Sequence, residues 1–132
     1  MWHVRATLHV LSQNGSLLTC SSISLLAALL HFRIPASEVR GGQLTVFNVL
    51  QRDPVPLALL HHPVCLTMAC FPADGDVESL IDPILVEEQV STGEIVVGGN
   101  KEGEVLLIEK NGGTAVEGAV LMKYVESAVQ KT

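Results

Sequence analysis

The pattern of apolar and polar residues predicts strands near the start, in the middle and in the last third of the chain. Every second residue from Val4 to Val10 is apolar and the residues between are mostly polar, so residues 3–12 (HVRATLHVLS) are expected to form a strand. Residues 64–71 (VCLTMACF) are nearly all apolar, which is typical of a central strand buried on both faces. Turns are expected at Asn14–Gly15, at 73–76 and at 100–103. Further strands are expected at residues 43–49, 77–81, 94–100 and 104–110.

Three segments have the signals of helices. Thr19–Arg33 carries a wide apolar stripe, a serine- and threonine-rich start that can cap it and Pro35 beyond its end. Asp82 followed by Pro83 predicts a short helix over residues 83–91, with Asp82 as the N-cap. A closing amphipathic helix is expected over Ala115–Lys131, with Val116, Val120, Tyr124 and Ala128 toward the core. The proline-punctuated residues 52–63 are expected to be a connection.

The order of these elements predicts a single α+β domain over residues 1–132, with a mixed sheet and helices packed on it. Of the 132 residues 48% are apolar and only 17% are charged, and the mean hydropathy is +0.39. This composition excludes intrinsic disorder and predicts that some apolar side chains face a partner. His and Pro interrupt the apolar runs before they reach the length of a membrane span, and no secretory signal is evident.

The charge distribution argues against autonomous nucleic-acid binding. The net charge is −6, the eight basic residues are scattered singly, and aromatic residues make up only 4% of the chain. If RNA is involved, other chains are expected to supply most of the positive charge. Cys20, Cys65 and Cys70 show no metal-finger spacing and are interpreted as reduced, buried thiols of an intracellular protein.

Three groups of residues are candidates for chemistry, and each has a plain alternative. Glu87, Glu88 and Glu94 could form a metal or acid/base site, or the solvated face of a short helix. His61–His62 lack a third ligand at a regular offset, which favours a polar loop over a zinc site. Serines surround the turn before the first helix, where phosphate can bind to free amides, but helix capping is the favoured explanation. These serines are Ser16, Ser21, Ser22 and Ser24.

Taken in order, four stretches resemble the RNase PH family, and within it the ring subunits of the RNA exosome. They are SLLTCSSISLLAALLHFRIP, RDPVPLALLHHPVCLTMACF, IDPILVEEQVSTGEIVVGGNKEGEVLLIEKNGG and the terminal helix. The resemblance covers nearly the whole chain and implies an RNase PH-like fold, of the type called ribosomal S5 domain 2-like. Family members carry roughly another hundred residues before this point, so the N-terminal half of the usual domain is expected to be absent and the core to be incomplete alone.

The resemblance also gives the acidic residues a context. Active members carry two aspartates, six residues apart, at the positions of Glu88 and Glu94, and a Ser-Arg pair that holds phosphate at the positions of Leu17 and Leu18. Two leucines supply neither a hydroxyl donor nor a guanidinium, and the longer glutamates displace the acids. Glu88 and Glu94 are therefore interpreted as vestiges of a site, with no catalytic residue, phosphate site, metal or cofactor retained.

The resemblance implies a non-catalytic structural subunit of the exosome ring. Such a subunit would support 3′-to-5′ RNA processing and degradation, including rRNA maturation, by other subunits, in the nucleus, nucleolus and cytoplasm. Its partners would be RNase PH-like neighbours and RNA bound collectively by the assembly, and no membrane. Two alternatives stay open: a divergent metal-dependent 3′–5′ exoribonuclease that uses Glu88 and Glu94, and a self-associating domain without an RNA role.

Overall fold

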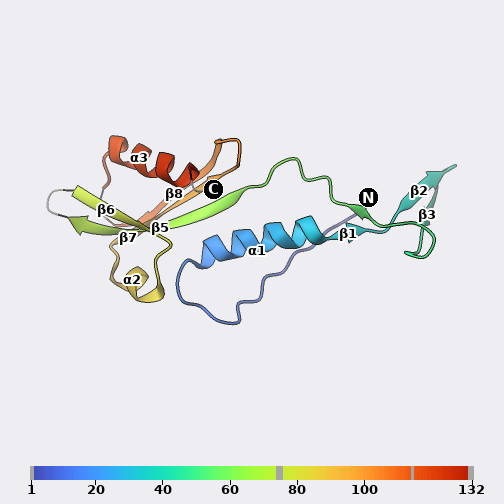
Figure 1. Ribbon diagram of the computed structural model, residues 1–132, viewed down its shortest axis with the longest axis horizontal. Coiled ribbons are helices and arrows are strands. Elements are labelled where there is room, and N and C mark those ends of the chain that lie inside the picture. The colour runs from blue at the N-terminus through green and yellow to red at the C-terminus, as the bar shows by residue number, and fades with distance from the viewer. Residues whose placement is uncertain (1, 74–75, 114, 131–132) are drawn as a thin grey trace.

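A four-stranded antiparallel sheet forms one end of the molecule, with its strands in the order β6–β5–β7–β8 (Figure 1). The structure is a computed structural model that describes residues 2–73, 76–113 and 115–130. Its strands are β5 (Val64–Ala73), β6 (Asp76–Ile81), β7 (Gly93–Gly99) and β8 (Val105–Gly112). The strands expected at 64–71 and 77–81 and the hairpin of 94–110 are confirmed. The turn expected at 73–76 lies partly outside the described residues. All strand pairings among the described residues are antiparallel, so the α+β class holds without a parallel ladder in this part of the chain.

The hydrophobic core lies between one face of this sheet and helix α3 (Gly118–Val129). Met68 and Ile95 are directly opposite each other on β5 and β7, and both are fully buried beneath Val125 and Ala128 of α3. Tyr124 and Ala128 lie against the core as predicted, whereas Val116 and Val120 do not belong to the core cluster. The stripe that packs is therefore Leu121, Tyr124, Val125 and Ala128, at the three- and four-residue spacing of one helix face.

Helix α1 (Leu17–His31) lies along the part of β5 that β6 does not reach. The Thr19 hydroxyl accepts a hydrogen bond from the Thr67 amide at 3.0 Å, and the Ser22 hydroxyl accepts one from the Cys65 amide at 3.1 Å. The helix thus satisfies strand amides that would otherwise lack a partner. The capping prediction is wrong, because no side chain caps α1 and its hydroxyls are used between elements instead.

The predicted strand at residues 3–12 is wrong. A strand needs a hydrogen-bonded neighbour, and no strand pairs with this segment in the part of the chain that the structure describes. The segment instead runs beside α1, where residues 3–8 line a shallow cavity with Leu25, Ala28 and Phe32 (Figure 1). Trp2, Val4, Leu8 and Val10 stay about half exposed.

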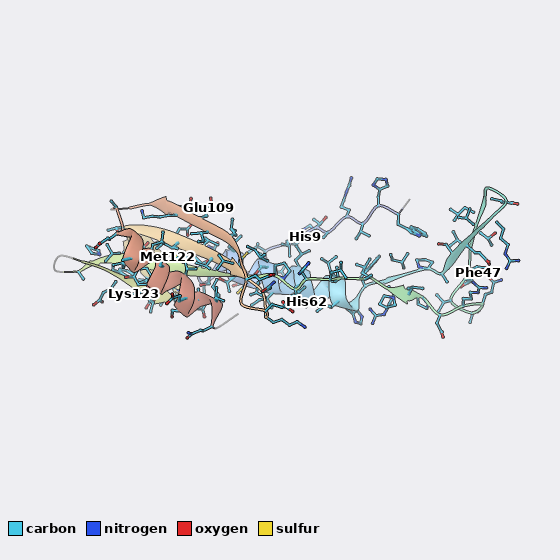
Figure 2. All side chains as sticks on the ribbon, turned by 90° about the horizontal axis from the view of Figure 1, so that it is seen from above. His9, Phe47, His62, Glu109, Met122 and Lys123 are labelled. Carbon is cyan, nitrogen blue, oxygen red and sulfur yellow. The ribbon has the colours of Figure 1, made fainter. Side chains whose placement is uncertain are left out.

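Beyond α1 the chain forms a long projection away from the sheet. Strands β1 (Arg33–Ile34) and β4 (Val55–Pro56) pair at its base, and β2 (Ser37–Arg40) and β3 (Gln43–Val46) pair further out. We call residues 35–54 the arm. Figure 2 shows Phe47 of the arm at the opposite end of the molecule from Met122 and Lys123 of α3. Strand β3 was expected, whereas β2 was not.

Candidate functional site

A polar pocket of about 310 Å³ lies on the sheet face opposite α3, beneath the short helix α2 (Leu85–Val90). Thr67 of β5 and Glu94 of β7 line it from the sheet, and Pro83, Glu88 and Ser91 line it from the α2 region. The pocket therefore contains two of the three glutamates that the sequence singles out. It joins residues from β5, β7, β8 and the α2 region.

Glu88 does not face solvent freely. Its Oε1 accepts a hydrogen bond from the backbone N–H of Ser16 at 2.7 Å, a length typical of a charge-assisted hydrogen bond. Ser16 is only 2% exposed and precedes α1, so its amide lies at the positive end of the helix. The carboxylate occupies the place where an external anion would bind to this helix start.

The turn before α1, at Gly15 and Ser16, contacts the backbone at Pro83 and Ile84 just before α2. Gly15 has φ +92°, and a Cβ atom placed there would lie 2.2 Å from the Pro83 carbonyl oxygen. Ser16 also has positive φ, and its hydroxyl approaches the same carbonyl oxygen at 3.4 Å. This close approach is what brings Glu88, 72 positions later in the chain, onto the Ser16 amide.

The start of α2 differs from the prediction. Helix α2 begins at Leu85, two residues later than expected, because Asp82 has φ +58° and donates its N–H to the Thr67 carbonyl at 3.2 Å. Pro83 is fully buried against the turn before α1. Glu87 accepts the Ile84 N–H at 2.8 Å, so neither paired glutamate belongs to a purely solvated face.

Glu94 lies on β7 directly opposite Asn111 of β8 and accepts its side-chain amide at 3.0 Å. Glu94 is half-buried and lines the same pocket as Glu88, and Asn111 orients its carboxylate. The hydroxyl of Thr67 is buried there without a hydrogen-bond partner among the described residues. Thr67 and Asn111 are site residues that sequence reasoning missed, because their roles depend on contacts between distant elements. Ser16 was a candidate for phosphate binding or capping, but it contributes its backbone N–H to Glu88 instead.

The hydroxyl and guanidinium that the family resemblance assigns to phosphate binding are replaced here by the side chains of Leu17 and Leu18. Leu17 and Leu18 open α1 and are 38% and 47% exposed, and their side chains offer no hydrogen-bond donor. Among the described residues that line the pocket, none is basic. The arrangement is therefore an acidic, hydroxyl-lined pocket next to a helix start that already holds a carboxylate.

The remaining candidates lie elsewhere. His61 and His62 belong to the connection before β5, and no group of three or more His, Cys, Asp or Glu suited to a metal occurs among the described residues. All three cysteines are free; Cys70 is buried and Cys65 half-buried, but Cys20 is exposed, contrary to prediction. Burial raises the pKa of the Cys65 and Cys70 thiols above its usual value. No helix in the described ranges is long and apolar enough to cross a bilayer.

Comparison with known proteins links this geometry to one family. A model of the RNase PH family, described as the 3′ exoribonuclease family, domain 1, matches residues 1–35. The exosome complex component rrp45 of Schizosaccharomyces pombe is 37% identical over 127 residues, which cover 96% of this chain and 43% of that protein. The human exosome complex component RRP45 is 37% identical over 113 residues, covering 86% of this chain and 25% of that protein. The chain thus spans less than half the length of these relatives.

Solved structures show the same fold. An archaeal exosome core chain matches with a TM-score of 0.65 and 21% identity, over 91% of this chain and 43% of that chain. The exosome of Archaeoglobus fulgidus with RNA bound to the active site matches with a TM-score of 0.70 and 19% identity, over 92% of this chain and 42% of that chain. The chain therefore belongs to the RNase PH family, and most of its length aligns with exosome components named RRP45.

Proposed function

We propose that this chain is part of a non-catalytic, structural subunit of the RNA exosome core ring. The proposal rests on its relatives, which are named exosome complex components, and on a fold shared with archaeal exosome cores. In this role the chain contributes interfaces and channel shape, and other subunits degrade and process RNA from the 3′ end, including rRNA precursors. RNA is held by the assembly as a whole, since this chain carries a net charge of −6.

One observation carries the non-catalytic part of the proposal: the Glu88 carboxylate accepts the Ser16 N–H. An acid held at a helix start by a charge-assisted hydrogen bond serves to attach α2 to α1. It also fills the position that an attacking phosphate would need, and Leu17 and Leu18 offer no replacement contacts. Glu88 therefore has a structural role in place of a catalytic one.

The surface of the chain supports its place in an assembly. Its accessible surface is 9303 Å², whereas a compact monomer of 14.1 kDa exposes roughly 6,700 Å². The surplus of about 2,600 Å² is of the size that permanent subunit interfaces bury. Much of it is apolar, including Leu11 at 97% and Leu50 at 94% exposed.

Co-expression tests the proposal directly. The chain is produced together with the RNase PH-like exosome subunits of the same genome, and native mass spectrometry identifies the species formed. We expect a stoichiometric heteromeric ring that contains the chain. A chain that stays separate from every one of these subunits would contradict the proposal. A fluorescent fusion is expected in the nucleus, nucleolus and cytoplasm.

A second candidate function is metal-dependent RNA cleavage. It is favoured by the two carboxylates in one pocket with the Thr67 hydroxyl, which has no hydrogen-bond partner among the residues that the structure describes, because carboxylate and hydroxyl oxygens suit Mg²⁺. Magnesium titration followed by thermal unfolding separates the two functions. The structural role predicts no rise in melting temperature at millimolar Mg²⁺. A rise that Glu94→Gln removes would favour the metal-dependent function.

A further inference from the structure

The arm, residues 35–54, has two chemically different faces. Directly opposite residues of an antiparallel pair point to the same side of the ladder. Val39 is opposite Leu44 and Ser37 is opposite Val46, so one face is aliphatic. Glu38 is opposite Thr45 and Arg40 is opposite Gln43, so the other face is polar. The arm is therefore an amphipathic hairpin, although it packs on no sheet of its own chain among the described residues.

Both faces of the arm are open, including the aliphatic one. Val39 is 68% exposed and Leu44 is 58% exposed, and on the polar face the Arg40 side chain is 82% exposed and that of Glu38 33%. An isolated two-stranded hairpin is marginally stable in water, and an open aliphatic face adds to that cost. The aliphatic face would be stabilised by a second apolar surface packed on it, and the described part of this chain does not supply one.

The charges of the arm are already neutralised within it. Arg40 pairs with Glu38 at 2.8 Å, and Arg52 approaches the other oxygen of the same carboxylate at 3.8 Å. The Arg52 guanidinium also lies over the Phe47 ring, 4.2 Å from its centroid. Nucleic acid would need free cations and an open aromatic face, and both are occupied here. These contacts favour a protein over RNA as the covering partner.

At least part of the arm also belongs to the fold shared with an exosome chain. The match to the A. fulgidus exosome covers 92% of this chain, so the unmatched residues are fewer than the residues of the arm. The arm extends away from the sheet at the far end of the molecule, where it can reach a neighbour without disturbing the core (Figure 2). The surface surplus of the chain is also large enough for a permanent interface.

We infer that the aliphatic face of the arm, formed by Val39, Leu44 and Val46, docks on an uncharged apolar surface of a neighbouring RNase PH-like subunit. This inference rests on the proposed ring function and adds to it the element that makes the contact. Glu38, Arg40 and Arg52 hold the hairpin in shape from the opposite face. The arm extends from this chain and contacts the neighbouring subunit.

Two matched double variants test the inference in the co-expressed ring. Leu44→Lys with Val46→Lys charges the aliphatic face, and Gln43→Lys with Thr45→Lys adds the same charge to the polar face of the same strand. The first pair is expected to reduce co-elution with the neighbouring subunit about tenfold or more, because buried lysines oppose docking, and the second to leave it within about twofold. Equal retention by both variants would overturn the inference while leaving the ring function intact. Failure of the unaltered chain to co-elute would instead contradict the ring function itself.

Site-specific photo-crosslinking gives an answer that does not depend on the folding of a charged variant. Benzoylphenylalanine at position 44 is expected to crosslink to an RNase PH-like neighbour, whereas at position 45 it is not. Crosslinks from position 44 to RNA, or to a second copy of this chain, would overturn the inference by naming a different occupant.

Discussion

At the scale of single residues, Glu88 shows how one carboxylate can join two distant elements. Its Oε1 is 2.7 Å from the Ser16 nitrogen, and the amide is almost completely buried. Glu88→Ala is expected to lower the free energy of unfolding by about 1.5–3 kcal/mol, because a buried donor loses a charged acceptor. Glu88→Gln keeps an acceptor oxygen and is expected to cost less. Chemical denaturation measures both, with exposed Glu126→Gln of α3 as the control.

An equal stability of Glu88→Ala and Glu126→Gln would contradict the structural role of Glu88. The comparison isolates position 88, because both variants remove one negative charge and Glu126 lies on the far face of the sheet, in α3. The sequence could not predict this role. Only the folded chain brings residues 16 and 88 together, and no local pattern spans 72 positions.

The three cysteines differ in exposure and are therefore expected to react with a labelling reagent at different rates. Cys20 is exposed, whereas burial raises the pKa of Cys65 and Cys70, with Lys110 partly offsetting the effect at Cys70. A raised thiol pKa leaves less thiolate at a given pH, so the two buried thiols need more alkaline solution to react. Iodoacetamide at pH 8 is expected to modify Cys20 first and Cys70 last, as read by peptide mass spectrometry. Equal rates in the native protein would contradict this order, and equal rates in denaturant serve as the control.

At the scale of elements, the attachment of α1 to β5 depends on two hydroxyls. Thr19→Val and Ser22→Ala leave the Thr67 and Cys65 amides without their acceptors, and each is expected to cost about 1–3 kcal/mol of unfolding free energy. Ser24→Ala on an exposed position of the same helix is the control, with an expected change of about 0.5 kcal/mol or less. Losses no larger than that of Ser24→Ala would show that the helix is held by other contacts.

The sequence predicted well those elements whose apolar residues are the ones buried in the fold. Residues 64–71 are apolar on both faces because β5 lies inside the sheet, and Tyr124 and Ala128 fall on the packed side of α3. The strand expected at 3–12 failed because alternation specifies a face but cannot supply a hydrogen-bonded neighbour. Strand β2 was missed because its four residues are too short for a clear period.

The same limit applies to the acidic site. Spacing singled out Glu87, Glu88 and Glu94, the family resemblance paired Glu88 with Glu94, and the structure places this pair in one pocket. Neither could show that Ser16 and Asn111 hold these carboxylates, or that the Thr67 hydroxyl lines the same pocket with no hydrogen-bond partner in the described part of the chain. These contacts arise from the turn at Gly15 and the register of β7 with β8.

At the scale of the whole molecule, the chain combines a small, well-packed core with an unusually open surface. One end holds the sheet and α3, the other holds the arm, and α1 connects them (Figure 1). Its accessible surface of 9303 Å² is larger than that of a compact monomer of 14.1 kDa. This open surface fits the proposed role in assembly, in which the Glu88 carboxylate serves as a contact between α2 and the start of α1.

Phosphate-dependent release of nucleoside diphosphates from a single-stranded RNA tests that role most directly. It is measured with the purified chain and with the co-expressed ring in which only this subunit is varied. We expect no phosphate-dependent release from the chain alone, and the same rate from rings that carry the unaltered chain or Glu88→Gln. Release that requires phosphate, is lost with Glu88→Gln and persists with Glu126→Gln would contradict the account.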